Sequence, residues 1–329
     1  MDADTLNFIL HFAGQAQAFQ YVQVAGMALF AYDSVILFTD EVNLIWKSRW
    51  TIPKVLYFLS RYVPFVDLSV NLYQTLAHPQ PSPETCHQLF IFVGWSMAVG
   101  MALSEVVMIL RVYAMWDRSR SVLYGLGTLW LGLVATSLYL IDTATRTFSF
   151  IAIPFPGASG CHYTVGRSFR LATSFLCLLV MEIAIVTLMV WAAATRWRSR
   201  YVFKSFDMTF KKLYFDGVFF FVCLLALSTL NILLTFLIPD NPALTLIFVV
   251  PLRVAHAILS CRLLLNTRRL ATKLVVFSGP HPVRRSTIMH ASASDPPLPE
   301  EPYIDLVELP TVGGHRHPVE DLPKFGRAF

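Results

Sequence analysis

The sequence predicts an all-α membrane protein, a bundle of seven transmembrane helices with the N-terminus outside and the C-terminal tail in the cytoplasm. Apolar residues make up 55% of the 329 residues and charged residues 14%, against about a quarter charged in soluble proteins. The apolar residues stand in blocks of about 20, which is the length of a membrane-spanning helix. Lysine and arginine gather in alternate connections between the blocks. A soluble helical protein would need polar helix faces that these blocks lack.

The apolar blocks define the expected helices, with ends placed to within about two to four residues. They cover residues 24–46, 52–76, 89–115, 122–141, 171–195, 213–238 and 244–265. The chain then divides into an N-terminal segment (1–20), a membrane domain (21–274) and a tail (275–329). The first segment has no lysine or arginine and so does not resemble a signal peptide. The first helix is therefore expected to direct insertion.

The basic residues predict the orientation, because cytoplasmic loops retain lysine and arginine. The second and sixth connections have none, and the long fourth connection has few. The first, third and fifth connections and the start of the tail are rich in them: Lys47, Arg49, Arg118, Arg120, Arg196, Arg198, Arg200, Lys204, Lys211, Lys212, Arg268 and Arg269. We expect the plasma membrane or another membrane of the secretory pathway. The net charge of +5 is explained by a cytoplasmic rim facing anionic lipid and requires no nucleic acid.

Five cysteines are present, and two of them fall in predicted outer loops. Cys86 precedes the third helix, and Cys161 lies in the long fourth connection. The outer side is oxidising, so a disulfide between them would tie this loop to the third helix; the alternative is two free thiols. The other three cysteines lie inside predicted helices, where they suit an apolar core. No pair has the spacing of metal ligands.

Charged and polar residues inside the apolar blocks are the candidate site. A charge at bilayer depth is costly unless it faces the bundle interior and is paired. The candidates are Asp33, Arg61, Asp67, Glu105, Glu182, Arg253 and His256. With helices following one another around a ring, and heights counted at about 1.5 Å per residue, the expected pairs are Arg61–Glu105 and Arg253–Asp33.

Two interpretations of these residues stay open. One is an internal polar network that sets helix register, and the other is a binding site or a proton path. Asp40, Glu41, Arg111 and Asp216 are expected near the inner interface, either solvated or paired. Ser96, Gly100 and Ser104 recur at intervals of four in the third helix, which lets another helix approach closely and suggests a central position.

The tail changes character from about residue 278, where proline, serine and then acidic residues dominate. Such a composition cannot bury a core and predicts disorder. Within it, "RRST" (Arg284–Thr287) matches a basophilic kinase site, with Thr287 as the candidate for phosphorylation. No Asn-x-Ser/Thr acceptor occurs in the chain.

One stretch carries a resemblance to a known family. "YDSVILFTDEVNLIWKSRWTIPKVLYFLSRYVPF", residues 32–65, resembles the signature of a large fungal family labelled domain of unknown function 6533. The Tyr32-Asp33 pair, Thr39-Asp40-Glu41, Trp46, Trp50, Lys54 and the Phe58–Tyr62 segment carry it. "RVYAMWDRS" after the third helix and "CRLLLNTRR" after the seventh are also similar. The resemblance implies a fungal multi-pass membrane protein, and it supplies no catalytic residues because the family has no established activity.

The overall layout is similar to G-protein-coupled receptors, without their motifs at the inner end of helix three or in helix seven. No nucleotide-binding, Ser-His-Asp or zinc motif is present, so neither an enzyme nor a cofactor is expected. The favoured interpretation is a receptor or sensor, with the bilayer, a small-molecule ligand and a cytoplasmic signalling protein as partners. A transporter using the charged cluster and a structural membrane protein are the alternatives. The sequence indicates no oligomeric state.

Overall fold

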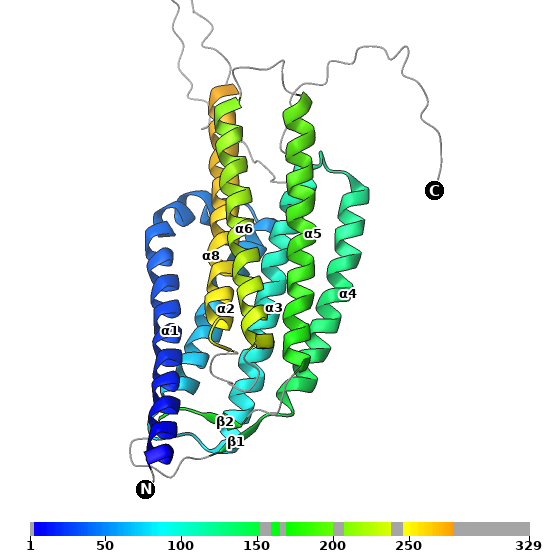
Figure 1. The fold of residues 1–329 in the computed structure, drawn as a ribbon. Coiled ribbons are helices and arrows are strands. Elements are labelled where there is room, and N and C mark those ends of the chain that lie inside the picture. The colour runs from blue at the N-terminus through cyan, green and yellow to red at the C-terminus, as the bar shows by residue number, and fades with distance from the viewer. Residues whose placement is uncertain (1–2, 152–158, 165–168, 200–206, 238–245, 279–329) are drawn as a thin grey trace, which may run out of the picture.

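The computed structural model describes residues 3–151, 159–164, 169–199, 207–237 and 246–278, and these form a bundle of long helices (Figure 1). The helices described are α1 (Ala3–Glu41), α2 (Ile52–Leu76), α3 (Pro83–Met115), α4 (Arg120–Thr145), α5 (Phe169–Ser199), α6 (Asp207–Leu237) and α8 (Val249–Ser278). A π-helical turn, η1 (Val42–Trp46), continues α1. Two short strands, β1 (Ser149–Ile151) and β2 (His162–Thr164), pair antiparallel. This confirms the predicted all-α fold class.

The helix ends show where hydropathy predicts a helix boundary well and where it does not. Both ends of α2 match the prediction. At its first end, Thr51 is extended and Pro53 lies in the first turn, a position that suits proline. By contrast, α1 begins at Ala3, although the first helix was expected to begin near residue 24. Hydropathy marks the apolar block, whereas a helix continues through polar residues until a breaker ends it. Residues 3–23 contain one glycine and no proline, so the helix continues through them. The predicted tail began at residue 275, but residues 275–278 belong to the helix α8; the rest of the tail, with Thr287, lies outside the described residues.

The helices follow one another around a ring, as expected. Each helix contacts the next from α1 to α6, and the ring closes through α6 with α8 and α8 with α1. The ring is flattened, because α2 also contacts α8, and α3 contacts both α5 and α8. The third helix is therefore central, as its small residues predicted.

The two ends of the bundle differ in chemistry. At one end lie the α1–α2 connection, the α3–α4 connection, and the ends of α5 and α8 (Figure 1). We call it the basic end, because the lysine and arginine clusters of the sequence fall there. The other end carries the two strands and the disulfide described below, and we call it the disulfide end. α5, α6 and α8 extend beyond the level at which α1 and α4 end at the basic end (Figure 1).

The surface of the bundle is that of a multi-pass membrane protein. Six of the described helices, all except α2, are long and apolar enough to cross a bilayer. Large apolar side chains are exposed along them, among them Val35 at 75% and Leu131 at 63%. Soluble monomers rarely expose large contiguous apolar surfaces. The lipid bilayer is therefore the environment of this fold.

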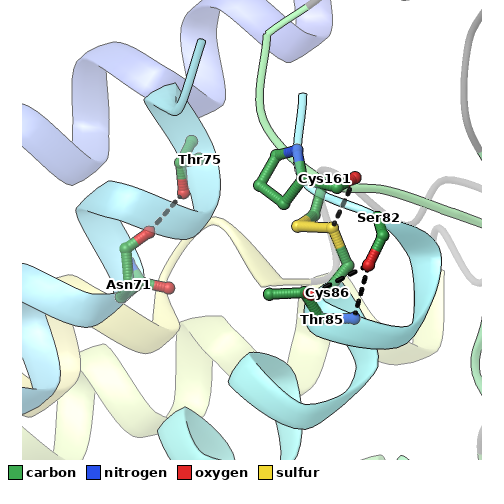
Figure 2. Close-up of a disulfide and its surroundings, with 7 residues drawn as sticks. Asn71, Thr75, Ser82, Thr85, Cys86 and Cys161 are labelled. Carbon is green, nitrogen blue, oxygen red and sulfur yellow. Dashed lines mark hydrogen bonds between the residues drawn. A yellow bond between two sulfur atoms is a disulfide. The ribbon is translucent and has the colours of Figure 1, made fainter. Parts of the chain in front are cut away.

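A disulfide joins the long fourth connection to α3, as the sequence predicted. Cys86 and Cys161 are bonded, with their Cα atoms 5.6 Å apart (Figure 2). The neighbouring backbone is held too, since the amide of Gly160 donates to Ala77 O at 2.9 Å and the amide of Cys161 to Gln74 O at 2.8 Å. Gly160 has a positive φ of 76°, and a Cβ there would meet the carbonyl of Thr75. This part of the loop is thus attached to the ends of α2 and α3.

Removing the disulfide is expected to destabilise the bundle. The bond closes a loop of 75 residues, and disulfides across long loops contribute about 2–5 kcal/mol. Cys86→Ser with Cys161→Ser should lower the thermal unfolding midpoint of the purified protein. Cys223→Ser, which changes a free cysteine in α6, is the matched control and should change the midpoint far less. Equal midpoints for the double variant and the wild type would contradict a structural role.

Candidate functional site in the helix bundle

The first charge cluster joins α1, α2 and α8, and we call it the α1–α2 charge cluster: Asp33, Glu41 and Arg61, which are buried, and Arg262, whose side chain is 42% exposed. Arg61 donates from Nη1 to Asp33 at 3.2 Å and from Nε to Glu41 at 3.3 Å. Arg262 donates from Nε to the other oxygen of Asp33 at 2.8 Å. Two carboxylates thus face two guanidinium groups, which balances the cluster and lowers the cost of placing charge inside the bundle.

Glu41 is the most heavily bonded member of the cluster. Besides Arg61, it accepts hydrogen bonds from Tyr62 Oη at 2.6 Å, Tyr57 Oη at 3.2 Å and Trp46 Nε1 at 3.0 Å. The bond from Trp46 is made across η1, the π-helical turn that follows Glu41. Widened turns of this kind re-aim side chains. Glu41 was expected near the interface, but it is 1% exposed, because these donors enclose it.

The connection between α1 and α2 is held by cations placed on backbone oxygens. Lys54 Nζ donates to Ser48 O at 2.6 Å and Trp46 O at 3.0 Å. Arg268 of α8 donates to Leu44 O at 2.9 Å and also bonds the hydroxyl of Ser48. The carbonyls left free where α1 ends thus receive charged donors, which fixes the turn against α8.

The second cluster is a buried ion pair between α2 and α8. Arg253 donates to one oxygen of Asp67 from Nε at 3.0 Å and from Nη2 at 2.9 Å, and both residues are fully buried. The guanidinium lies against α3 at Gly100, where a Cβ would collide with it. The small residue predicted to allow close helix packing therefore makes room for this side chain.

Gly100→Ala is expected to destabilise the protein, because the added methyl group overlaps a guanidinium that Asp67 holds in place. Overpacking of this kind costs about 1–3 kcal/mol. Gly127→Ala in α4 is the control, since no atom lies within 4 Å of the position that its added methyl group would take, and alanine favours a helix. Thermal unfolding of both variants in one detergent checks this. A midpoint for Gly100→Ala at or above that of Gly127→Ala would contradict it.

The third cluster joins α3, α5, α6 and α8 and contains no arginine or lysine among the contacts described. Glu182 of α5 accepts from Ser228 Oγ of α6 at 2.8 Å, and the same oxygen is 3.0 Å from His256 Nε2 of α8. The second oxygen of Glu182 and Nδ1 of His256 are buried without a partner among the described residues. Glu105 of α3 is an electrostatic neighbour of Glu182.

Glu105 also lines a small pocket between α3, α4 and α5. Its lining runs from Glu105 toward the disulfide end, past residues such as Met101, Leu133 and Ile141. The pocket has a volume of about 40 Å³, and on the same measure a water molecule needs about 10–15 Å³. It therefore has room for a small chemical group.

The seven sequence candidates are all inside the bundle and at most 3% exposed, but both expected pairs are wrong. Arg61 meets Asp33 and Glu41 instead of Glu105, and Arg253 meets Asp67 instead of Asp33. Height alone does not select a partner, because the rotation of each helix decides which neighbour a side chain faces. In addition, α2 and α8 contact each other across the flattened ring, which a simple ring excludes.

Several members of these clusters were missed by reasoning from single charges. Arg262 lies close to a helix end expected near residue 265, and Ser228 is an ordinary residue of an apolar helix. Of the residues expected at the inner interface, Asp40 bonds Arg269 and Arg111 bonds Thr267, whereas the side chain of Asp216 is not described. The aromatic donors Tyr57 and Tyr62 could have been found from the sequence, since both lie within four residues of Arg61 in the quoted signature.

Among the residues the structure describes, no group of three or more His, Cys, Asp or Glu side chains is arranged to hold a metal ion. No curated protein matches the chain at a significant level. One family model matches, and it covers the segment that builds the α1–α2 turn. The matched segment includes Asp33, Glu41, Trp46, Lys54 and Arg61. The matching model is that of a family of unknown function, DUF6533, and it matches residues 21–66.

Proposed function

We propose that this protein is a seven-span membrane receptor or sensor, with its basic end in the cytoplasm, and that it is not an enzyme. The proposal requires α2 to be the seventh span. Its buried side includes Lys54, Arg61 and Asp67, which lower its mean hydropathy. Its exposed positions are almost all apolar and recur every three or four residues: Ile52, Val55, Leu59, Tyr62, Val66, Tyr73 and Leu76. Such a helix presents an apolar surface to lipid.

The observation that carries the proposal is the one-sided position of the pocket. From Glu105 the pocket extends toward the disulfide end. Toward the basic end, α3 and α5 bury an apolar cluster together with α6, and it includes Val112, Ile185, Met189 and Leu224, each at most 1% exposed. A transporter needs a route that can open to both sides, whereas a sensor needs a site on one side only. The packing favours the sensor.

Glu182 supplies a connection from this pocket to the basic end. It neighbours Glu105 and bonds Ser228 of α6 and His256 of α8. α6 and α8 are two of the three helices that extend beyond the rest at the basic end (Figure 1). A change at the pocket that moves Glu182 therefore acts directly on these helices. The lysines and arginines near the α5–α6 connection suit a cytoplasmic partner with an acidic surface.

The test is a pair of distance measurements by electron paramagnetic resonance. One pair of spin labels, at Trp50 and Thr209, reports the basic end, and a second pair, at Thr85 and Arg170, reports the disulfide end. The free cysteines Cys177, Cys223 and Cys261 are first replaced by alanine, while the disulfide stays intact. Each pair is measured with Glu182 present and with Glu182→Gln.

A sensor is expected to show two distances at the basic end, with a ratio that depends on Glu182 and little change at the disulfide end. Linked changes at both ends would favour a transporter instead. A single distance at both ends, unchanged by Glu182→Gln, would favour a structural membrane protein and overturn the proposal.

The orientation is tested separately by protease protection in sealed microsomes. A tag after Phe329 should be digested from the cytoplasmic side, and a tag before Met1 should be protected, because basic loops stay in the cytoplasm. A chain with Lys47 and Arg49 replaced by glutamine is the control for the contribution of the first connection. Protection of the C-terminal tag in the wild type would reverse the assignment.

A further inference from the structure

The buried carboxylates of the bundle divide into those that contact an arginine and those that do not. Asp33 and Glu41 contact Arg61, and Asp67 contacts Arg253. Glu105 and Glu182 have no arginine or lysine contact among the described residues. Ser228 and His256 bond Glu182. In a membrane, the charged form of two neighbouring carboxylates without a fixed cation is costly to bury, so a bound cation would stabilise that charged form.

The pocket lies at the carboxylate that has the least compensation. Glu105 is 3% exposed and is the one charged side chain among the residues that line the pocket. The remaining lining is mostly apolar, with Ser137 and Ser174 as hydroxyl groups. An apolar wall with one carboxylate is suited to an organic cation, and it lacks the several oxygen ligands that Mg²⁺ or Ca²⁺ requires.

We propose that this pocket binds the ammonium group of a small primary amine, with the carboxylate of Glu105 as its counter-ion. The proposal names the ligand class of the sensor proposed above and rests on it only for its signalling consequence. The volume of about 40 Å³ admits an ammonium group with a short alkyl chain and excludes drug-sized ligands. The same ammonium chemistry is offered by a free amine in solution and by the ethanolamine head group of a phospholipid.

The experiment uses the full chain in phosphatidylcholine nanodiscs, whose choline head group has no N–H donor. The unfolding midpoint is followed with a dye that reacts with thiols, since Cys177, Cys223 and Cys261 are free. The probe is n-butylammonium, and n-butanol is the neutral comparison. The wild type should be stabilised by the ammonium ion and not by the alcohol.

Three variants locate the effect. Glu105→Gln removes the charge and keeps the shape, and it should raise the apparent Kd for n-butylammonium on the order of a hundredfold. Ser137→Leu fills the pocket from α4 and keeps Glu105, so it should also abolish binding, and it serves where Glu105→Gln fails to fold. Asp142→Asn is the matched acid-to-amide control at the exposed end of α4, and it should bind as the wild type does.

Equal stabilisation of the wild type and Glu105→Gln would overturn the site, as would equal effects of the amine and the alcohol. Adding phosphatidylethanolamine to the nanodiscs separates the two sources. If this lipid raises the midpoint of the wild type and suppresses the response to n-butylammonium, the head group is the occupant; if it changes neither, a free amine is. Amine binding without a change at the Trp50–Thr209 label pair would refute the sensor and leave the site standing.

Discussion

Replacing either member of the Arg253–Asp67 pair is expected to cost about 3–5 kcal/mol of unfolding free energy, because the partner is left charged and fully buried. Arg253→Met and Asp67→Ala together should cost much less than the sum, since no lone charge then remains. Unfolding by a denaturing detergent gives the four free energies of the cycle. The coupling expected is several kcal/mol, well above the scatter of about 0.5 kcal/mol for independent sites.

Two control cycles make the result specific. Among the hydrogen bonds of the described residues, Arg253 and Asp33 share no partner, so their replacements should add. Arg146 and Asp142 form an exposed pair at the end of α4, and water screens it, so its coupling should be slight. Additive effects for Arg253 with Asp67 would contradict the pair, and coupling between Arg253 and Asp33 would contradict the helix arrangement.

The fold class was predictable because lipid imposes a simple rule on sequence. Every spanning helix must satisfy its backbone hydrogen bonds internally and present apolar side chains to lipid, so length and hydropathy locate the helices. The Cys86–Cys161 link was predictable from the same topology, since both residues were expected in connections at the same end of the bundle. The extension of α1 back to Ala3 was not, because outside the membrane no hydropathy signal marks where a helix begins.

The candidate site was predictable in its members and unpredictable in its pairs. Burial of a charge inside a membrane protein requires a compensating group, so each intramembrane charge in the sequence marks a residue of the interior. Which group compensates depends on helix rotation and on contacts across the ring. Arg61 and Asp67 lie six residues apart on α2, about 240° around the helix, so they face different neighbours. The sequence gives this angle between the two side chains, but only the structure shows where α1 and α8 lie around α2.

The segment that matches the family model encloses one buried carboxylate. Glu41 needs donors from four positions in the chain, namely Trp46, Tyr57, Arg61 and Tyr62. These donors must stand at fixed spacing on both sides of the α1–α2 turn. Lys54, which lies between them, must hold the turn itself. A single enclosed acid therefore constrains the residue types at four positions within the twenty-one residues that follow it.

Arg61→Met is expected to be the most damaging single change in this segment. It removes the cation that contacts Glu41 and one of two cations that contact Asp33, so it leaves Glu41 buried with neutral donors alone. The cost expected is about 3–5 kcal/mol, the range for breaking a buried ion pair. A fall in the yield of folded protein by size-exclusion chromatography, with a lower unfolding midpoint, is the measurement.

Neutralising each of the two carboxylates should rescue Arg61→Met to a different extent. Glu41→Gln removes the stranded charge and keeps an acceptor for Tyr57 and Tyr62, so adding it to Arg61→Met should restore much of the yield. Asp33→Asn should restore less, because Asp33 keeps Arg262 at 2.7 Å and is not stranded. In the wild-type background Glu41→Gln alone should instead harm the protein, since Arg61 then retains only Asp33. Equal rescue by the two replacements would show that Arg61 serves both acids alike, and rescue by neither would show that its packing, rather than its charge, is what the bundle requires.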